Sequence, residues 1–222
     1  YLGALIPDVV PAILNKKSGI KTMDQWMKSK TPLKIGTQCP LCDAFSDNAK
    51  LMKEVLGVPM QIVEGYKGTA DIKLAVESGE LDGGGFEWNN VKLTFRKALD
   101  AGDLVLVLMI SPKKYPDFPP NVPEMMDLAK TDEARQLINV GVHRMAEIAR
   151  PFVLPPGTPS ERLQILRNAF QETLKDKEFL AEVKEAKFNL DPITGEELSK
   201  AVSEIFRTDP ANLAKLKQIF LK

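Results

Sequence analysis

The sequence has very few of the side chains from which metal sites and nucleophilic active sites are built. Its 222 residues include two cysteines and one histidine. A structural zinc site needs four such ligands, and a single histidine, His143, makes Ser-His-Asp or Cys-His arrangements hard to assemble. Two cysteines are also too few for a disulfide scaffold. We therefore expect no metal, no cofactor and no catalytic residues.

Neither an excess of one charge nor a long apolar run is present. Thirty basic residues balance thirty acidic ones, so no global field attracts nucleic acid or anionic lipid. The longest apolar run, 104–110, is far shorter than the roughly 20 residues that cross a bilayer. The chain opens at Tyr1 without a basic and apolar leader, and we take any export signal to have been removed. These features predict a soluble globular protein, expected to be a monomer, with no nucleic-acid partner and no membrane span.

What the sequence does contain is a repeated strand, loop and helix pattern. Strands are predicted at 33–36 and 60–63, and helices follow at about 47–56 and 71–77. Further strands are predicted at Leu81 to Gly83 and within 104–110, and an earlier buried strand at 8–16. The alternation predicts an α/β fold with a largely parallel sheet and right-handed crossovers.

The second half of the chain has a different character. Five prolines within 112–123 predict an irregular connection, and almost everything after residue 157 is helical in pattern. Capping boxes are predicted at Thr158 to Glu161 and at Thr194 to Glu197. The apolar stripe of the first of these helices, Leu163, Leu166, Phe170 and Leu174, needs something to cover. Either the helices pack back on the sheet, or part of their partner is absent.

The two loops that precede helices are the best candidates for a binding site. They run from Thr37 to Asp47 and from Gly65 to Asp71. Unpaired N–H groups and the positive end of the helix dipole favour carboxylate or phosphate at such places. Additional side-chain donors are Thr37, Gln38, Ser46 and Thr69, while Gly65 and Gly68 permit close approach. The simpler interpretation is that these residues only cap their helices.

The pair Cys39 and Cys42 has the spacing of a thioredoxin-type motif ahead of a helix. Three interpretations remain open at this point: a thiol-disulfide oxidoreductase, a local structural disulfide, or two free thiols. The rest of the sequence shows no thioredoxin-like pattern around the pair.

A glycine run followed by aromatic residues forms the third candidate. Gly83 to Gly85 lacks both the Lys-Ser/Thr of a P-loop and the spacing of a dinucleotide fingerprint. The following residues, Phe86, Glu87 and Trp88, suit the wall of a ligand cleft. The alternative is an ordinary loop with Trp88 in the core.

Several segments resemble the substrate-binding receptors of tripartite tricarboxylate transporters. The clearest are IVEGYKGTADIKLAVESGELDG at 62–83 and RPFVLPPGTPSERLQILRNAFQETLKDKEFLAE at 150–182. SGIKTMDQWMK at 18–28, DFPPNVPEMMDLAKTDEARQL at 117–137 and DPITGEEL at 191–198 continue the likeness in the same order.

This resemblance implies a periplasmic receptor with a two-lobed type II binding-protein fold. Such receptors are not enzymes; they hold a small organic acid between two lobes and deliver it to membrane permease subunits. The resemblance implies a complete α/β lobe at 17–149, with 1–16 and 150–222 belonging to a second lobe whose N-terminal segment is lacking here. By position, the implied ligand contacts are Thr37, Gln38, Tyr66, Gly68, Thr69 and Ala70. A thiol-disulfide oxidoreductase using Cys39 and Cys42 is the alternative function.

Overall fold

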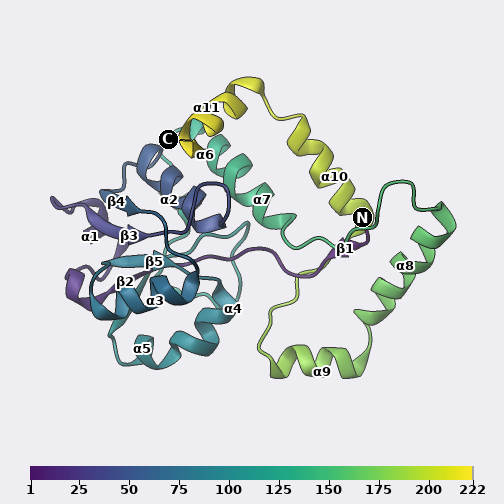
Figure 1. Ribbon diagram of the computed structural model, residues 1–222, viewed down its shortest axis with the longest axis horizontal. Coiled ribbons are helices and arrows are strands. Elements are labelled where there is room, and N and C mark those ends of the chain that lie inside the picture. The colour runs from purple at the N-terminus through teal and green to yellow at the C-terminus, as the bar shows by residue number, and fades with distance from the viewer. Residues whose placement is uncertain (222) are drawn as a thin grey trace.

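The larger part of the molecule is a lobe built on a mixed five-stranded sheet (Figure 1). The computed structural model describes residues 1–221. In space the strands follow the order β4-β3-β5-β2-β6. Their bounds are β2 Ala12–Asn15, β3 Leu33–Gly36, β4 Met60–Val63, β5 Gly83–Gly85 and β6 Leu104–Leu108.

The direction of β2 corrects the expected sheet. β3 pairs in parallel with β4 and β5, but β2 runs antiparallel to both β5 and β6. The structure therefore places residues 12–15 in the sheet of the larger lobe, whereas the family resemblance implied that 1–16 belong to the other lobe. β5 also lies two residues later than the strand predicted at Leu81 to Gly83.

Helices cover both faces of the sheet, and the alternation of strand side chains separates two hydrophobic cores. Leu14 belongs to the core with Trp26, Leu51 and Ile138, whereas its neighbour Ile13 belongs to the opposite core with Ile72. The α-helices of this lobe are α1 Met23–Met27, α2 Ala44–Glu54, α3 Thr69–Ser78, α4 Trp88–Asn90, α5 Arg96–Asp100, α6 Asp132–Ile138 and α7 Arg144–Glu147. Short 3-10 helices span Lys16–Ser18 and Met125–Leu128, and π-helical turns span Val91–Phe95 and Asn139–His143.

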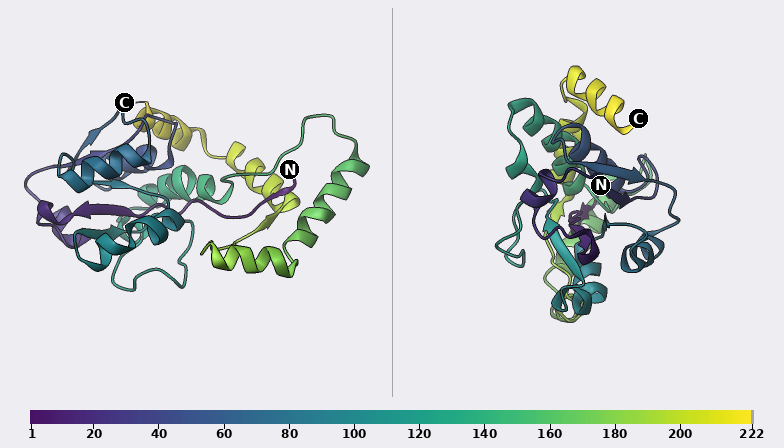
Figure 2. Two further views of the ribbon diagram at one scale, coloured as in Figure 1. Left: turned by 60° about the horizontal axis from the view of Figure 1, so that its bottom comes forward. Right: turned by 90° about the vertical axis from the view of Figure 1, so that its left-hand side faces the viewer.

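The smaller part is mainly helical and extends away from the sheet (Figures 1 and 2). Its two short strands, β1 Gly3–Ala4 and β7 Ile193–Thr194, pair antiparallel. Its helices are α8 Ser160–Thr173, α9 Lys177–Glu185 and α10 Gly195–Phe206. The last helix, α11 Pro210–Phe220, returns to the larger lobe, where Leu216 and Ile219 join the core and the Lys50 ammonium donates to the Phe220 carbonyl over 3.0 Å.

The first expected capping box is absent and the second is present. Helices α8 and α9 do not pack back on the sheet, which was one of the two alternatives: within residues 1–221 neither has a buried residue, although Phe170 of α8 lies against Phe152 with ring centroids 5.4 Å apart. Thr158 does not cap α8; its hydroxyl donates to the Pro155 carbonyl, and Pro159 occupies the N-cap position. The second capping box, Thr194 with Glu197, is present at the start of α10.

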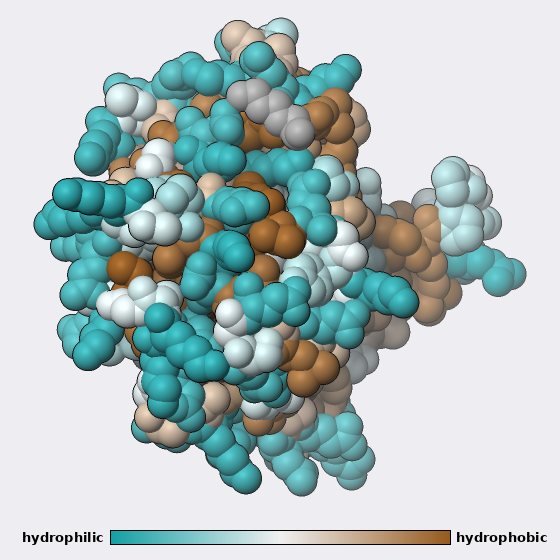
Figure 3. Space-filling view, turned by 60° about the vertical axis from the view of Figure 1, so that its left-hand side comes forward, coloured by the Kyte–Doolittle hydropathy of each residue, from teal (hydrophilic) through white to brown (hydrophobic). Residues whose placement is uncertain are grey.

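In Figure 3, hydrophilic side chains cover most of the visible face of the larger lobe, whereas apolar ones are prominent on the part that projects behind it.

Candidate functional site

A cavity of about 160 Å³ lies at the edge of the sheet where β3, β4 and β5 end. In open α/β sheets this edge is the usual place for a ligand. Gln38 comes from the loop after β3, Thr69 from the start of α3, and Glu87 from the turn after β5. The lining is Asp8, Val10, Gln38, Asp43, Ala44, Phe45, Thr69, Ile72, Gly85, Phe86, Glu87 and Arg150.

The N-terminus of α2 is closed by its own capping residue. One carboxylate oxygen of Asp43, Oδ1, accepts from the Phe45 N–H over 2.9 Å and from the Ser46 N–H over 3.3 Å. The other, Oδ2, accepts from the Gln38 N–H over 3.2 Å and from the Ser46 hydroxyl. The expectation of free N–H groups at this helix is therefore wrong, because a carboxylate of the chain already neutralises the dipole there.

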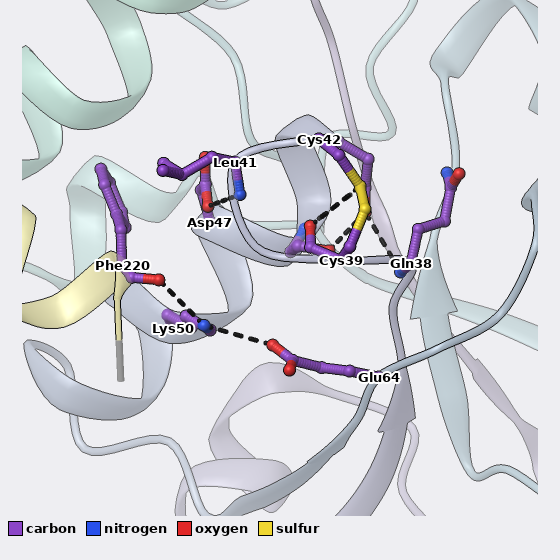
Figure 4. A network of polar contacts seen from close by, with 10 residues as sticks. Gln38, Cys39, Leu41, Cys42, Asp47, Lys50, Glu64 and Phe220 are labelled. Atoms are coloured by element: carbon purple, nitrogen blue, oxygen red, sulfur yellow. Dashed lines mark hydrogen bonds and ion pairs between the residues drawn. A yellow bond between two sulfur atoms is a disulfide. The ribbon is translucent and has the colours of Figure 1, made fainter.

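The loop that leads into α2 is tied down by further contacts (Figure 4). Cys39 and Cys42 form a disulfide at the exposed tip of the loop, and the Leu41 N–H donates to the Asp47 carboxylate over 3.1 Å. Burial raises the pKa of Asp47 despite this hydrogen bond. The helix begins at Ala44, three residues before the predicted start, because Asp43 rather than Ser46 or Asp47 is its N-cap.

The N-terminus of α3, in contrast, is open. Its N-cap is Gly68, which has no side chain to cap the helix, and the Asp71 and Ile72 N–H groups bond back to the Gly68 carbonyl. Within residues 1–221, the N–H groups of Thr69 and Ala70 have no hydrogen-bond acceptor. These two donors and the half-buried Thr69 side chain stand beside the cavity, where a carboxylate can be held by hydrogen bonds and by the helix dipole.

One cation and two more carboxylates complete the polar lining of the cavity. Nη1 of Arg150 lies 2.6 Å from Oδ1 of Asp8. Burial raises the pKa of Asp8, with the nearby Glu87 charge acting in the same direction and Arg150 opposing it. Glu87 accepts from the Asn90 N–H over 2.8 Å and from the Asn89 amide over 3.0 Å. Arg150 has a φ of 51°, a conformation that non-glycine residues adopt rarely and often at functional sites.

The structure brings some of the predicted residues together at the cavity and places others elsewhere. Gln38, Thr69, Phe86 and Glu87 line it, and Gly68 and Ala70 flank Thr69. The other four predicted residues do not line the cavity. Thr37 is buried, and the Ser46 hydroxyl donates to Asp43. The Tyr66 hydroxyl donates to Glu80 over 2.7 Å, and the buried Trp88 donates from Nε1 to Asp117 over 2.9 Å. Burial is the main reason that the pKa of Tyr66 rises to about 12, with the Glu80 hydrogen bond adding to it.

Sequence reasoning missed Asp8, Asp43 and Arg150. Asp43 carried a usable signal, since an aspartate just before an apolar helical stripe is a typical N-cap. Asp8 and Arg150 carried none, because they are 142 positions apart by number and meet only where the two connections between the lobes run side by side.

A larger and mainly apolar cavity, of about 620 Å³, adjoins the first one. The two share Asp8, Val10, Asp43, Ala44 and Arg150 in their linings. The apolar wall of the larger cavity comes from the segment 140–149 and from the C-terminal helices, and it includes Val142, Met145, Ile148, Ile205, Leu213 and Phe220. The two cavities are therefore neighbours that meet at these shared residues.

Comparisons with known proteins support the fold that the resemblance implies. No known family model matches the sequence, and no curated protein gives a significant match. Among solved structures, a TctC solute binding protein from Polaromonas, without ligand, is 13% identical with a TM-score of 0.64, covering 98% of this chain and 67% of that one. An R. palustris protein solved with adipate is 16% identical with a TM-score of 0.62, covering 97% and 67%.

A third structure, described as a periplasmic transporter, is 17% identical with a TM-score of 0.66 and covers 99% of this chain and 68% of that one. The chain thus has the α/β fold of TctC-type periplasmic binding proteins, as predicted, and spans about two thirds of the length of these structures. Within residues 1–221, no helix is long and apolar enough to cross a membrane.

Proposed function

We propose that this protein is a solute-binding receptor that takes a small organic acid into the cavity at the edge of the larger sheet. The observation that carries the proposal is the open N-terminus of α3, where the Thr69 and Ala70 N–H groups lack acceptors beside a cavity that also receives Arg150. A helix N-terminus contributes about 0.3–1 kcal/mol to a nearby anion, and desolvation strengthens this contribution. The similar fold that was solved with adipate supports a carboxylate as the ligand.

The proposed cycle follows from the position of the cavity between the two parts of the chain. Asp8 and Arg150 lie on the connections between them, so a ligand held there contacts residues whose relative position changes when the lobes close. Closure would shield the bound acid from water. We further propose a periplasmic location and delivery to membrane permease subunits; both rest on the neighbouring structures.

The test is a thermal-shift and calorimetric screen of the protein against succinate, adipate, citrate and benzoate. A ligand at one hundred times its Kd stabilises a protein by about 2.7 kcal/mol, so a genuine ligand gives a clear rise in Tm. Arg150→Gln should weaken binding at least tenfold, because it removes the one cation of the cavity. The exposed Arg162→Gln is the matched control and should bind as the unaltered protein does. If no acid raises Tm, this proposal fails.

The exposed Cys39–Cys42 disulfide favours the alternative function, thiol-disulfide exchange. An insulin-reduction assay separates the two. We expect the protein to match the buffer rate, and Cys39→Ala to make no difference. Turnover above buffer that disappears in Cys39→Ala would instead establish the redox function.

A further inference from the structure

We propose that the preferred solute carries an amino group next to its carboxylate and has an apolar body. This inference rests on the proposed function, since it names the chemical class of ligand for the same cavity. The charges that line the cavity and the mainly apolar cavity beside it support this class of ligand.

The polar lining is not that of a site for a simple anion. Its ionisable side chains are three carboxylates, Asp8, Asp43 and Glu87, and one guanidinium, Arg150, which gives a formal charge of −2. Asp43 is largely offset by the four donors it accepts from at the start of α2. Asp8 and Glu87 remain against Arg150, which leaves a net charge of −1, and the two carboxylates are close enough for the Glu87 charge to raise the pKa of Asp8. A second negative group entering beside them would be repelled.

The Asp8 and Glu87 carboxylates retain acceptor capacity. Oδ1 of Asp8 is buried and pairs with the Arg150 nitrogen 2.6 Å away, and Glu87 accepts two hydrogen bonds from Asn89 and Asn90, whereas an ionised carboxylate has about four lone-pair sites. A buried carboxylate oxygen is stabilised when a charged donor approaches it, and an ammonium group brings three donors and a positive charge. The cavity therefore offers acceptors for an ammonium at Asp8 and Glu87 and donors for a carboxylate at Thr69 and Ala70. This pairing matches the two charges of an amino acid.

The apolar body follows from the larger cavity. The polar cavity of about 160 Å³ suits a small charged head group, and it shares five lining residues with the neighbouring cavity of about 620 Å³. The larger volume lies within the range of small-molecule sites, and its apolar wall includes Met145, Ile148 and Phe220. A solute that is charged at one end only suits both cavities, whereas a second carboxylate in the larger cavity would meet one ammonium group, Lys217, in a mainly apolar wall that also holds Asp47.

The experiment compares matched pairs of acids with and without the amino group by isothermal titration calorimetry. The pairs are leucine with 4-methylpentanoate, phenylalanine with 3-phenylpropanoate, and 2-aminoadipate with adipate; alanine tests the need for the apolar body. We expect the amino member to bind at least tenfold tighter in the two apolar pairs, and leucine or phenylalanine to bind at least tenfold tighter than alanine.

Two isosteric variants test which residues hold the amino group. Asp8→Asn and Glu87→Gln should each reduce the preference for the amino member to threefold or less, and should raise the affinity for the acid without the amino group, because a repelling charge is removed. Glu182→Gln, exposed on α9, is the charge-matched control and should keep the preference. Circular dichroism and Tm of each variant verify that it is folded.

The outcomes separate this inference from the function on which it rests. If the acids without an amino group bind as tightly as their partners, or if alanine matches leucine, the inference is overturned while the receptor function stands. If no acid of either kind binds, the receptor function fails as well. A parallel titration with Ca²⁺ tests whether the carboxylates bind a metal ion instead of an ammonium group. Ca²⁺ binding that Asp8→Asn and Glu87→Gln both abolish would overturn the inference.

Discussion

The N-termini of α2 and α3 differ in how their unpaired N–H groups are satisfied, because they differ in the residue at the N-cap. Both helices follow a strand of the same parallel pair and begin at the same edge of the sheet. At α2 the Asp43 carboxylate accepts four hydrogen bonds and closes the helix end. At α3 the N-cap is Gly68, and two N–H groups are left for a ligand. The same strand-loop-helix unit thus has a capped helix N-terminus at α2 and an open one, available to a ligand, at α3.

The glycine run of β5 brings both helices against the sheet. A Cβ on Gly85 would lie 1.9 Å from Cδ2 of Phe45 on α2, and a Cβ on Gly84 would lie 2.8 Å from a methyl group of Ile72 on α3. The absence of side chains at these positions lets the first turn of each helix approach β5. The glycine run is therefore a packing surface for the two helices.

The largest effect is expected from Gly85→Ala. Overpacking in a filled core costs about 1–3 kcal/mol, and the obstacle here is an aromatic ring carbon of Phe45 that cannot move aside alone. Urea unfolding measures the loss. Gly84→Ala is the matched control and should cost less, because the atom closest to its added Cβ, the Cγ2 methyl of Ile72, is 2.8 Å away rather than 1.9 Å. Equal losses for the two would show that the α2 side is no more tightly packed than the α3 side.

The next effect is expected from Asp43→Ala, which removes the cap of α2. Loss of an N-cap side chain costs about 0.5–2 kcal/mol, and Asp43 should lie at the upper end because the Gln38 N–H also loses its acceptor. The free energy of unfolding in urea is again the measurement. Asp43→Asn keeps one oxygen acceptor and should retain more than half of this stabilisation. If Asp43→Ala were as stable as the unaltered protein, the α2 end could not be called closed by this residue.

Reduction of the Cys39–Cys42 disulfide should have a smaller effect. The two cysteines are three positions apart, and a loop this short gives at most about 2 kcal/mol by the chain-entropy estimate, so we expect a loss of about 1 kcal/mol. Comparing Tm with and without reductant measures it, and Cys39→Ser/Cys42→Ser should be insensitive to reductant. A change in ligand affinity on reduction would mean that the α2 loop takes part in binding.

The smallest change in stability, and the sharpest change in binding, is expected from Gly68→Asp. Gly68 has an extended φ of −179° and nothing within 4 Å of an added Cβ, so an aspartate there can cap α3 and stabilise it by a few tenths of a kcal/mol. The same carboxylate would accept from the Ala70 N–H, as Asp43 does from the corresponding Phe45 N–H at α2, and would place a negative charge at the anion site. The affinity for the acid ligand should therefore fall at least tenfold by calorimetry. Gly68→Asn adds a cap without charge and should weaken binding less. Unchanged affinity in Gly68→Asp would exclude the α3 end as the anion site.

Much of the framework could be predicted from local sequence. The strands at 33–36 and 60–63 and the Thr194 capping box lie where predicted, because each depends on neighbours within a few residues. The antiparallel direction of β2 could not be predicted in this way. It is set by which strands β2 pairs with, and its partners β5 and β6 lie about 70 to 90 residues further along the chain.

The sequence by itself determined that strands and helices alternate and that two loops precede helices at one edge of a sheet. The structure placed Gly68 at the N-cap of the second of these helices, which begins two residues before the predicted start. Only the tertiary structure decided that Asp43 closes the first of these helices and that Asp8, Glu87 and Arg150 face one cavity. The physical reason is that caps and periodicity act between neighbours in the chain, whereas charges act through space. Which charges meet depends on where the two connections between the lobes pass each other.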